Sequence, residues 1–435
     1  MNTSRHFCGS AEHDLTRRAF LGSTFVGAAS LLGTSGAVHA FAEKSVTDSL
    51  KQSGRRVILL WLAGGPSQLE TWDPKPGRPT GGPFGEIPTS VPGVRICELM
   101  PLMAKRMKDV CVIRSLNTKN ADHGGAAKLM HRGRNDEPAL KYPDLGAIVA
   151  RELARADSQV PDYVSFYTAT EGRGMAQPTA SFLGARFNPM NLYEQNTPPN
   201  LHRPGSLTEQ EHDERAQLQA LLGRQFALGR DTSEVRSHAN AYARVHGLMA
   251  SEKLFDISKE PAKLRERYGP TLFGEQTLMA RRMVEAGVPF VRVSRAWWDS
   301  HGQNFETHQE MVPELDRVMS ALIDDLKERG LFESTLIVAV GEFGRTPVIN
   351  ASLGRDHFAK AWSAALAGGG VQRGMVFGKT DKDGNEVAEG EVGAGELFAT
   401  VLEAAGIKHD KEYHVGARPV PLVNPGIKPI KEVLA

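Results

Sequence analysis

The sequence predicts an α/β fold, a three-layer α/β/α sandwich with a mostly parallel central sheet and an added helical insertion. Predicted strands and helices alternate through most of the chain after residue 55, as in parallel sheets whose strands are joined by crossover helices. Segments 57–63 and 336–340 are apolar throughout, which is typical of strands covered by helices on both faces. At 435 residues, the chain is long enough for one large core or two ordinary ones.

The predicted domain spans residues 56–430 and opens with a central strand. This strand, 56–63, ends at Gly64-Gly65-Pro66-Ser67. The stretch that follows, to about residue 94, is rich in Pro and Gly and is predicted to be a long loop of the kind that carries function. The next predicted elements are a helix (98–107), a strand (110–114), a loop (115–137), a helix (142–156) and a strand (162–166).

Two segments outside the sheet are predicted next. Residues 168–205 are irregular and are expected to cover one face, and residues 207–253 are polar and helical, forming an insertion or a cap. Five later apolar residues repeat at steps of three and four, which places them on one helical face: Val312, Leu315, Met319, Leu322 and Leu326. The other predicted elements are a helix (273–286), two strands (289–294 and 336–340) and a helix (396–405) closed by Gly406.

The first 40 residues are predicted to be an export signal rather than part of the fold. Thr16-Arg17-Arg18-Ala19-Phe20-Leu21 places paired arginines before an apolar run at 21–32, and Val38-His39-Ala40 offers a cleavage site. The pattern resembles a bacterial twin-arginine signal, so we expect a periplasmic or extracellular protein that uses the twin-arginine translocation machinery. The run is too short for a membrane span, and residues 41–55 are a linker. The alternative is a disordered basic N-terminus.

Charge and cysteine content narrow the possible functions. The 52 basic and 51 acidic residues nearly cancel, which argues against a nucleic-acid or membrane-surface partner. Cys8 would be lost with the export signal. Cys97 and Cys111 either pair in an oxidising compartment or remain buried free thiols, and their spacing is not a zinc pattern.

The loop after the first strand carries two hydroxyl side chains. Ser67 and Thr71 are possible nucleophiles, but a hydroxyl needs an activating base or a metal. Gly64 and Gly65 permit a tight turn and the close approach of a ligand. A purely structural turn explains the loop equally well.

Two further loops concentrate acids and histidines, and each follows a predicted strand. The first holds Asp299, His301 and His308, a mixed carboxylate and imidazole set that suits zinc, iron or manganese. Its alternative is a helix-capping Asp with surface histidines. The second loop holds four candidate site residues: Glu342, Arg345, Asp356 and His357. Because the carboxyl ends of parallel strands share one edge, we expect these side chains to converge.

Arg345 has two possible roles in the second of these loops. Its guanidinium suits either an ion pair with Glu342 or bidentate binding of an anionic group. The structural alternative is a buried Glu–Arg pair with Asp356 and His357 on a solvated loop. His123 is a further candidate on the same grounds, and His131 is expected to be ordinary. Residues 381–385 fit a hairpin tip better than a calcium loop.

Four motifs in order resemble the DUF1501 family: Gly-Gly-Pro-Ser-Gln-Leu-Glu-Thr-Trp-Asp-Pro-Lys-Pro (64–76), Asp-Ser-His-Gly-Gln-Asn-Phe (299–305), Gly-Glu-Phe-Gly-Arg-Thr-Pro (341–347) and Gly-Arg-Asp-His (354–357). These bacterial proteins usually carry twin-arginine signals and are grouped with the alkaline phosphatase and sulfatase superfamily. The resemblance implies an alkaline phosphatase-like core with a two-metal site at the carboxyl ends of the strands. It implies metal ligands among Glu70, Asp299, His301, His308, Glu342, Asp356 and His357.

The first loop departs from the pattern of the DUF1501 family at two positions. Ser67 stands where related proteins often have Asp, and Glu70 stands where close relatives often have Asp. The Cys-x-Pro-x-Arg motif of formylglycine sulfatases is absent from the sequence, which argues against that subclass.

The expected function is an exported metal-dependent hydrolase of phosphate or sulfate esters, acting on a small-molecule or glycan ester. It would use divalent ions, two in number, drawn from Zn, Mn, Mg or Ca. Ser67 or Thr71 would be the nucleophile, and Arg345 would offset charge on the transferred group. His123 would bind substrate or donate a proton to the leaving group. The alternative is a non-catalytic exported protein that keeps the scaffold to bind a glycan, a surface partner or a metal.

Overall fold

The computed structural model describes residues 54–155, 160–166, 178–192, 197–198, 201, 205–230 and 252–435, together with the single residues 232, 235, 242, 247 and 249. The expected export signal (1–40) and nearly all of the linker lie outside these ranges. In the described part of the chain, none of the helices combines the length and the apolar character needed to cross a membrane.

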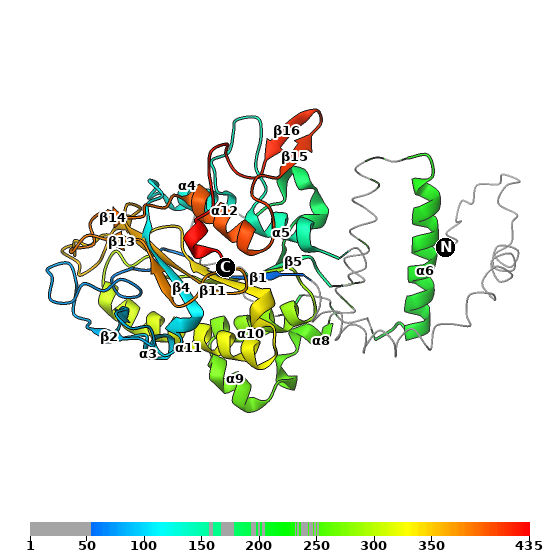
Figure 1. Cartoon of the computed structure of the whole chain (residues 1–435). Coiled ribbons are helices and arrows are strands. Elements are labelled where there is room, and N and C mark those ends of the chain that lie inside the picture. Colours follow the sequence, from blue (N-terminus) through cyan, green and yellow to red (C-terminus); the bar gives the residue numbers. More distant parts are fainter. Residues whose placement is uncertain are drawn as a thin grey trace, which may run out of the picture. The chain divides into compact units, whose positions relative to one another are not determined.

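The centre of the fold is a sheet that lies between helices (Figure 1). It has eight strands in the order β12-β4-β11-β8-β1-β7-β5-β6. Its strands are β1 (Arg56–Leu62), β4 (Val110–Leu116), β5 (Tyr163–Phe166), β6 (Met190–Leu192), β7 (Phe290–Arg295), β8 (Thr335–Val340), β11 (Trp362–Gly368) and β12 (Met375–Phe377). Strand β1 pairs in parallel with β7 on one side and with β8 on the other. Strand β11 is antiparallel to both of its neighbours, β4 and β8. The predicted mostly parallel sheet is therefore confirmed.

Helices cover both faces of this sheet (Figure 1). One layer contains α3 (Pro101–Ala104), α9 (Ala262–Tyr268), α10 (Leu272–Glu285) and α11 (Asn304–Glu328), and the other contains α4 (His123–Arg132), α5 (Leu145–Leu153) and α12 (Ala394–Ala404). Alternate residues of each strand serve the two layers, because successive side chains of a strand point to opposite faces. Thus Ile58 and Leu60 belong to the core under α10 and α11, whereas Leu59 and Trp61 belong to the core under α5 and α12. The predicted three-layer sandwich is confirmed.

The long helix α11 has the predicted apolar face. All five of the residues that repeat at steps of three and four are fully buried: Val312, Leu315, Met319, Leu322 and Leu326. Helix α10, strand β7 and helix α12 also lie within one or two residues of their predicted ranges. The predicted helix 98–107 is shorter, being confined to α3 and a separate 3-10 turn at Met107–Asp109.

Helix α4 lies within residues 115–137, where a loop was predicted, so that prediction was wrong. Gly124 and Gly125 next to Asp122 resemble a turn, but they form the first turn of this helix. The Asp122 carboxylate caps that turn by accepting a hydrogen bond from the Gly125 backbone N–H (2.7 Å). Gly133, with φ of 67°, closes the helix in the left-handed conformation. The prediction was wrong because capping at both ends outweighs the low helix propensity of glycine.

The remaining described elements are small hairpins and the helix of the 207–253 segment. The hairpins pair β2 (Glu86–Pro88) with β3 (Arg95–Cys97), β9 (Gly344–Arg345) with β10 (His357–Phe358), β13 (Lys379–Thr380) with β14 (Val387–Glu389), and β15 (Glu412–Val415) with β16 (Arg418–Pro421). Residues 381–385 form the tip between β13 and β14, as predicted. Helix α6 (Glu209–Ala227) begins with a capping box at Thr208 and Glu211. Cys97 and Cys111 are separate buried thiols.

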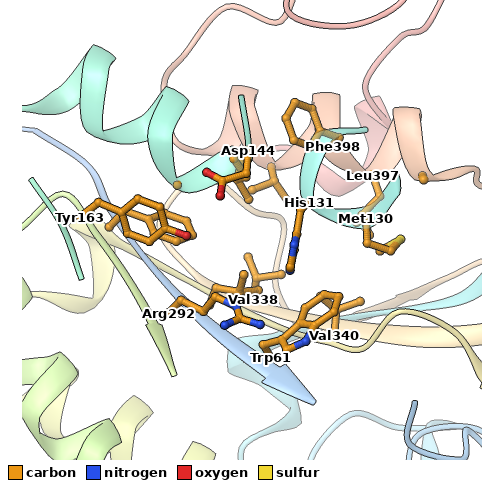
Figure 2. Close-up of a pocket in the computed structure, with 16 residues that line it drawn as sticks. Trp61, Met130, His131, Asp144, Tyr163, Arg292, Val338, Val340, Leu397 and Phe398 are labelled. Carbon is orange, nitrogen blue, oxygen red and sulfur yellow. The ribbon is translucent and has the colours of Figure 1, made fainter. Parts of the chain in front are cut away.

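A small cavity of about 30 Å³ lies between the sheet and the layer of α4, α5 and α12 (Figure 2). Its lining combines apolar side chains with Trp61, His131, Asp144 and Arg292, and the Trp61 and His131 rings lie 4.4 Å apart. Trp61 Nε1, His131 Nε2 and Asp144 Oδ2 are buried and find no hydrogen-bond partner among the described residues. The cavity has room for about one or two water molecules. His131 is thus a buried core residue.

Candidate metal centre

Three loops meet where neighbouring strands β8, β1 and β7 end. Gly64 follows β1, Asp299 follows β7 and Glu342 follows β8, so the expected convergence at one sheet edge is present. The approach is tight: a Cβ atom on Gly64 would lie 2.5 Å from the Asp299 backbone nitrogen. Gly64 also has φ of +108°, which L side chains rarely adopt. Glycine at position 64 therefore lets β1 and the Asp299 loop lie against each other.

His123 enters this edge from the first residue of α4. Its Nδ1 lies 2.8 Å from Glu342 Oε1, and its Nε2 lies 3.2 Å from Asp299 Oδ2. Glu342 is fully buried, and the same oxygen accepts a hydrogen bond from the Gly64 N–H (2.9 Å). Glu342 thus contacts the imidazole of His123, and the imidazole contacts Asp299.

His357 and His301 approach Asp299 from the other side. His357 Nε2 lies 3.1 Å from Asp299 Oδ1, and His301 Nε2 lies 3.2 Å from the same oxygen. His357 Nδ1 faces the Ala121 carbonyl at 2.8 Å, and His301 Nδ1 faces Asp356 Oδ1 at 2.7 Å. Because a carbonyl and a carboxylate only accept hydrogen bonds, both Nδ1 atoms carry a hydrogen. In the neutral rings, each Nε2 therefore presents a lone pair towards Asp299.

These atoms form a cluster that needs a positive charge at its centre. The Nε2 atoms of His301 and His357 are 3.0 Å apart, and both face a carboxylate oxygen of Asp299. Three acceptors at this separation repel one another unless a proton or a cation lies among them. In a tetrahedral zinc site with ligands at about 2.0–2.1 Å, ligand atoms lie about 3.3 Å apart, close to the spacing seen here. His123, Asp299 and His357 also place one ligand atom each within 4.8 Å of one another.

The outer partners of the three imidazoles match those of metal-binding histidines. A metal-ligating His usually donates its second ring N–H to a carboxylate or a backbone carbonyl, which fixes its tautomer and orientation. Here Glu342, Asp356 and the Ala121 carbonyl have that relation to His123, His301 and His357. The residues present therefore fit one divalent cation held by His123, Asp299 and His357, with His301 beside them.

The charges of the cluster shift its pKa values strongly. Burial lowers the pKa of His123, but hydrogen bonds to Asp299 and Glu342 and the charges of both outweigh burial and raise it to about 9. Burial would raise the pKa of Asp299, but His123, His357 and Arg345 hold it well below its ordinary value. The hydrogen bond from His301 lowers the pKa of Asp356. A cation that binds His123 Nε2 would displace a proton from it.

Arg345 is fully buried behind Asp299. Its Nη2 donates to Asp299 Oδ1 at 2.5 Å and also to the Gly64 carbonyl. Its Nε donates to the Gly65 carbonyl (2.9 Å), and its Nη1 donates to the Arg355 carbonyl (3.1 Å). In the β9–β10 hairpin, Arg345 is the direct partner of His357. The guanidinium is thus turned towards protein acceptors, and the ion pair with Glu342, one of the two roles considered for Arg345, does not form.

Glu70 and His308 lie outside the imidazole cluster, in a buried layer beneath it. Glu70 receives hydrogen bonds from Arg355 to both carboxylate oxygens (2.7 and 3.1 Å) and one from Asn304 (3.1 Å). His308 Nδ1 donates to the Asn304 carbonyl (2.8 Å), and its Nε2 accepts from the Ser67 backbone N–H (3.0 Å). Burial lowers the pKa of His308 to about 4, which keeps it neutral. Both residues hold the first loop to α11 and the Asp356 loop.

The two predicted nucleophiles are also buried. Ser67 is 0 % exposed and Thr71 is 1 % exposed. The Thr71 hydroxyl donates to the Ser67 carbonyl (2.7 Å), and Ser67 Oγ accepts from the Leu69 N–H (3.3 Å). In contrast, Asp299 and His301 are 40 % and 49 % exposed at their side chains. The open side of the cluster therefore presents imidazoles and carboxylates.

Sequence reasoning missed two residues that position this centre, Arg355 and Gln68. Arg355 lies inside the Gly-Arg-Asp-His motif, and its adjacency to Asp356 was the available indication. Gln68 accepts from the Arg345 N–H (3.0 Å) and donates to the Arg345 carbonyl (2.8 Å), joining the first loop to β9. No local pattern in the sequence singles out Gln68.

Comparison with solved structures finds distant similarities. Solved structures similar to this chain include the PsFucS1 sulfatase from Pseudoalteromonas sp., at 14 % identity and a TM-score of 0.40, covering 84 % of this chain and 71 % of that one. Another is a protein in the alkaline phosphatase superfamily from Vibrio parahaemolyticus, at 11 % identity and a TM-score of 0.35, covering 82 % and 67 %. A mutant TAB5 alkaline phosphatase is 11 % identical with a TM-score of 0.36, covering 82 % and 99 %.

Among curated proteins, none matches the sequence of this chain. The model of the family described as "Protein of unknown function (DUF1501)" matches residues 54–434. This match takes in the whole sheet, both helix layers and every residue of the candidate metal centre. The chain is a member of the DUF1501 family.

Proposed function

We propose that this protein is an exported, metal-dependent hydrolase of phosphate or sulfate esters. The observation that supports the proposal most directly is the convergence of three imidazole nitrogens on Asp299. His123 Nε2, His301 Nε2 and His357 Nε2 lie 3.1 to 3.2 Å from its carboxylate oxygens. The imidazole and carboxylate mixture suits zinc, manganese or iron better than magnesium or calcium.

A divalent cation at this place would lower the pKa of a water molecule and offset the negative charge of a phosphate or sulfate ester. His123, Asp299 and His357 would hold it, with His301 beside them. Glu342 accepts a hydrogen bond from His123 Nδ1, and Asp356 accepts one from His301 Nδ1, which fixes the orientation of both rings. The partial exposure of Asp299 and His301 leaves one side of the cluster open to an ester in solvent.

In this proposal, water is the attacking group rather than a side-chain hydroxyl. Ser67 and Thr71 are buried and hydrogen-bonded within the first loop. Arg345 is equally buried, and its three nitrogens all donate to protein acceptors. Arg345 therefore acts by holding Asp299 in place, and it does not contact the transferred group.

The burial of both hydroxyls also favours a second candidate. A non-catalytic exported protein could use the same cluster to bind a metal without turning over an ester. Both candidates share the predicted export, which is supported by the twin arginines at Arg17 and Arg18 and the apolar run after them. Both therefore place the mature protein in the periplasm or outside the cell.

The experiment pairs metal analysis of the purified mature protein with a screen of aryl phosphate, phosphodiester and aryl sulfate substrates. We expect bound transition metal and turnover of at least one substrate class. His357→Ala should lose both metal and activity, whereas His414→Ala, which alters an exposed histidine on β15, should keep both. Bound metal without turnover would establish the binding protein instead. A protein that takes up no metal would refute both candidates.

A further inference from the structure

Arg345 lies beside Asp299 in the proposed metal centre, and the inference about it rests on that proposal. We propose that the centre holds a single divalent cation and that the Arg345 guanidinium takes the place of a second one. The resemblance to the alkaline phosphatase superfamily implies two metals. The residues of this chain fit one metal and do not fit the other.

The guanidinium occupies a position built from oxygen atoms. It donates to Asp299 Oδ1 at 2.5 Å, to the Gly65 carbonyl at 2.9 Å and to the Arg355 carbonyl at 3.1 Å, and it also contacts the Gly64 carbonyl. One carboxylate oxygen and three carbonyl oxygens would suit a hard cation such as calcium. Here the positively charged Arg345 side chain occupies this position and donates hydrogen bonds to the four oxygens.

Asp299 joins the two positive positions. One of its oxygens, Oδ1, contacts both Arg345 and the Nε2 atoms of His301 and His357, while Oδ2 faces His123. In two-metal sites, the ions lie about 3.5 to 4 Å apart and clamp the reacting oxygens between them. In this chain, Asp299 Oδ1 contacts both imidazoles and a guanidinium.

Two of the other predicted ligands, Glu70 and His308, are not available to a second metal. Both oxygens of Glu70 accept hydrogen bonds from Arg355, and both ring nitrogens of His308 are hydrogen-bonded to backbone groups. Both side chains are fully buried. Within the described ranges, the one group of three or more His, Cys, Asp or Glu side chains spaced to share an ion is His123, Asp299 and His357.

Arg345 is held too firmly to move aside for an ion. Its backbone N–H and carbonyl are both hydrogen-bonded to the Gln68 side chain (3.0 and 2.8 Å). Strand β9 further pairs it with His357 in β10. An arginine side chain stays charged and is more weakly hydrated than a lysine ammonium, so it suits a buried position beside a carboxylate. The positive charge of Arg345 therefore stays beside Asp299 in the folded protein.

The test is the number of ions bound. Metal-free protein, prepared with a chelator, is titrated with Co²⁺ and followed by calorimetry and by the visible absorption of tetrahedral cobalt. We expect saturation at one equivalent, with no further heat from added Ca²⁺. Two equivalents would overturn this inference and leave the proposed function standing. No binding at all would overturn both.

Two variants separate the charge of Arg345 from its shape. Arg345→Ala removes the cation and frees the four oxygens, so the cobalt-loaded variant should gain one bound Ca²⁺ that the native protein lacks. Arg345→Lys keeps a positive charge and should gain none. A folded Arg345→Ala protein, with native far-ultraviolet circular dichroism, that binds no Ca²⁺ would overturn the inference. If Arg345→Ala does not fold, the stoichiometry of the native protein decides the question.

Discussion

At the scale of single residues, Glu342 is buried but still contacts the metal cluster through His123. It accepts from His123 Nδ1 at 2.8 Å, and its second oxygen has no hydrogen-bond partner among the described residues. A buried carboxylate of this kind makes the imidazole more basic and fixes its direction. Glu342 therefore tunes the centre without touching the ion.

Glu342→Gln should weaken metal binding about 10- to 100-fold, because the amide makes His123 a poorer ligand. The measurement is the Kd for Zn²⁺ or Co²⁺ in competition with a chelator. Glu391→Gln, at a carboxylate that pairs with exposed Lys119, is the matched control and should keep the native Kd. Equal Kd values in the two variants would show that Glu342 has no part in the centre.

Asp144 makes stability depend on pH. It caps α5 by accepting from the Ala147 N–H (2.8 Å) and lines the cavity of Figure 2, and burial raises its pKa from 3.8 to about 7. Between these values, the folded chain binds the proton more tightly than the unfolded chain. Its contribution to the free energy of unfolding is therefore full below about pH 4 and is lost as the pH rises to 7. The loss is at most about 4 kcal/mol, since one pKa unit corresponds to about 1.4 kcal/mol.

Asp144→Asn should remove this dependence, because Asn keeps the cap but carries no charge. We expect the variant to be more stable than the native protein above pH 7 and to lose less stability between pH 4 and 7. Urea unfolding at several pH values measures both effects, and Asp410→Asn, an exposed site, should leave the native profile unchanged. A variant with the native pH profile would contradict the assignment.

At the scale of elements, the beginning of α4 determines where His123 points. Asp122 accepts from the Gly125 N–H, and His123 is the next residue, so the cap and the ligand share one turn. Loss of an N-cap costs about 1 kcal/mol and lets the first turn fray. Fraying here would release the imidazole from Glu342 and Asp299.

Asp122→Ala should therefore weaken Co²⁺ binding severalfold while the rest of the fold is kept. Asp122→Ser supplies another capping oxygen and should stay near the native Kd. Calorimetry gives the affinities, and circular dichroism checks the fold. If alanine and serine bind cobalt equally well, the cap does not position His123.

The elements also show where sequence patterns succeed. Strands β1 and β8 were predicted because burial on both faces gives a continuous apolar run in the sequence. Helix α11 was predicted because burial of one face gives apolar residues at steps of three and four. Helix α4 was missed because its signal lies in two caps around a glycine pair. Strand β11 was missed because its sequence, WSAALAG, is rich in small residues and has weak strand propensity. Its place between β4 and β8 comes from pairing across the sheet.

At the scale of the whole molecule, the candidate metal centre joins distant parts of the chain. The residues that would hold the ion come from α4, from the loop after β7 and from strand β10. An ion that binds these residues only when they are assembled stabilises the folded state by mass action. At a free concentration of a hundred times Kd, this amounts to about 2.7 kcal/mol.

The Tm of the mature protein should accordingly rise with Zn²⁺ concentration and fall after treatment with a chelator. His357→Ala should show neither change, because it lacks a ligand from β10. Differential scanning calorimetry over a range of zinc concentrations measures the effect. A Tm that is independent of zinc in the native protein would argue against a folded-state metal site.

The sequence by itself determined the α/β layers, the glycine turn after β1 and the loops in which Asp299, Glu342 and His357 lie, because burial and turn chemistry are recorded locally. The tertiary structure alone decided which side chains in those loops face one another. Arg355 turns Glu70 inward, Ser67 and Asn304 hold His308, and Gly64 and Gly65 receive the Arg345 guanidinium. Each of these contacts joins residues from separate loops, and no short-range pattern encodes such pairs.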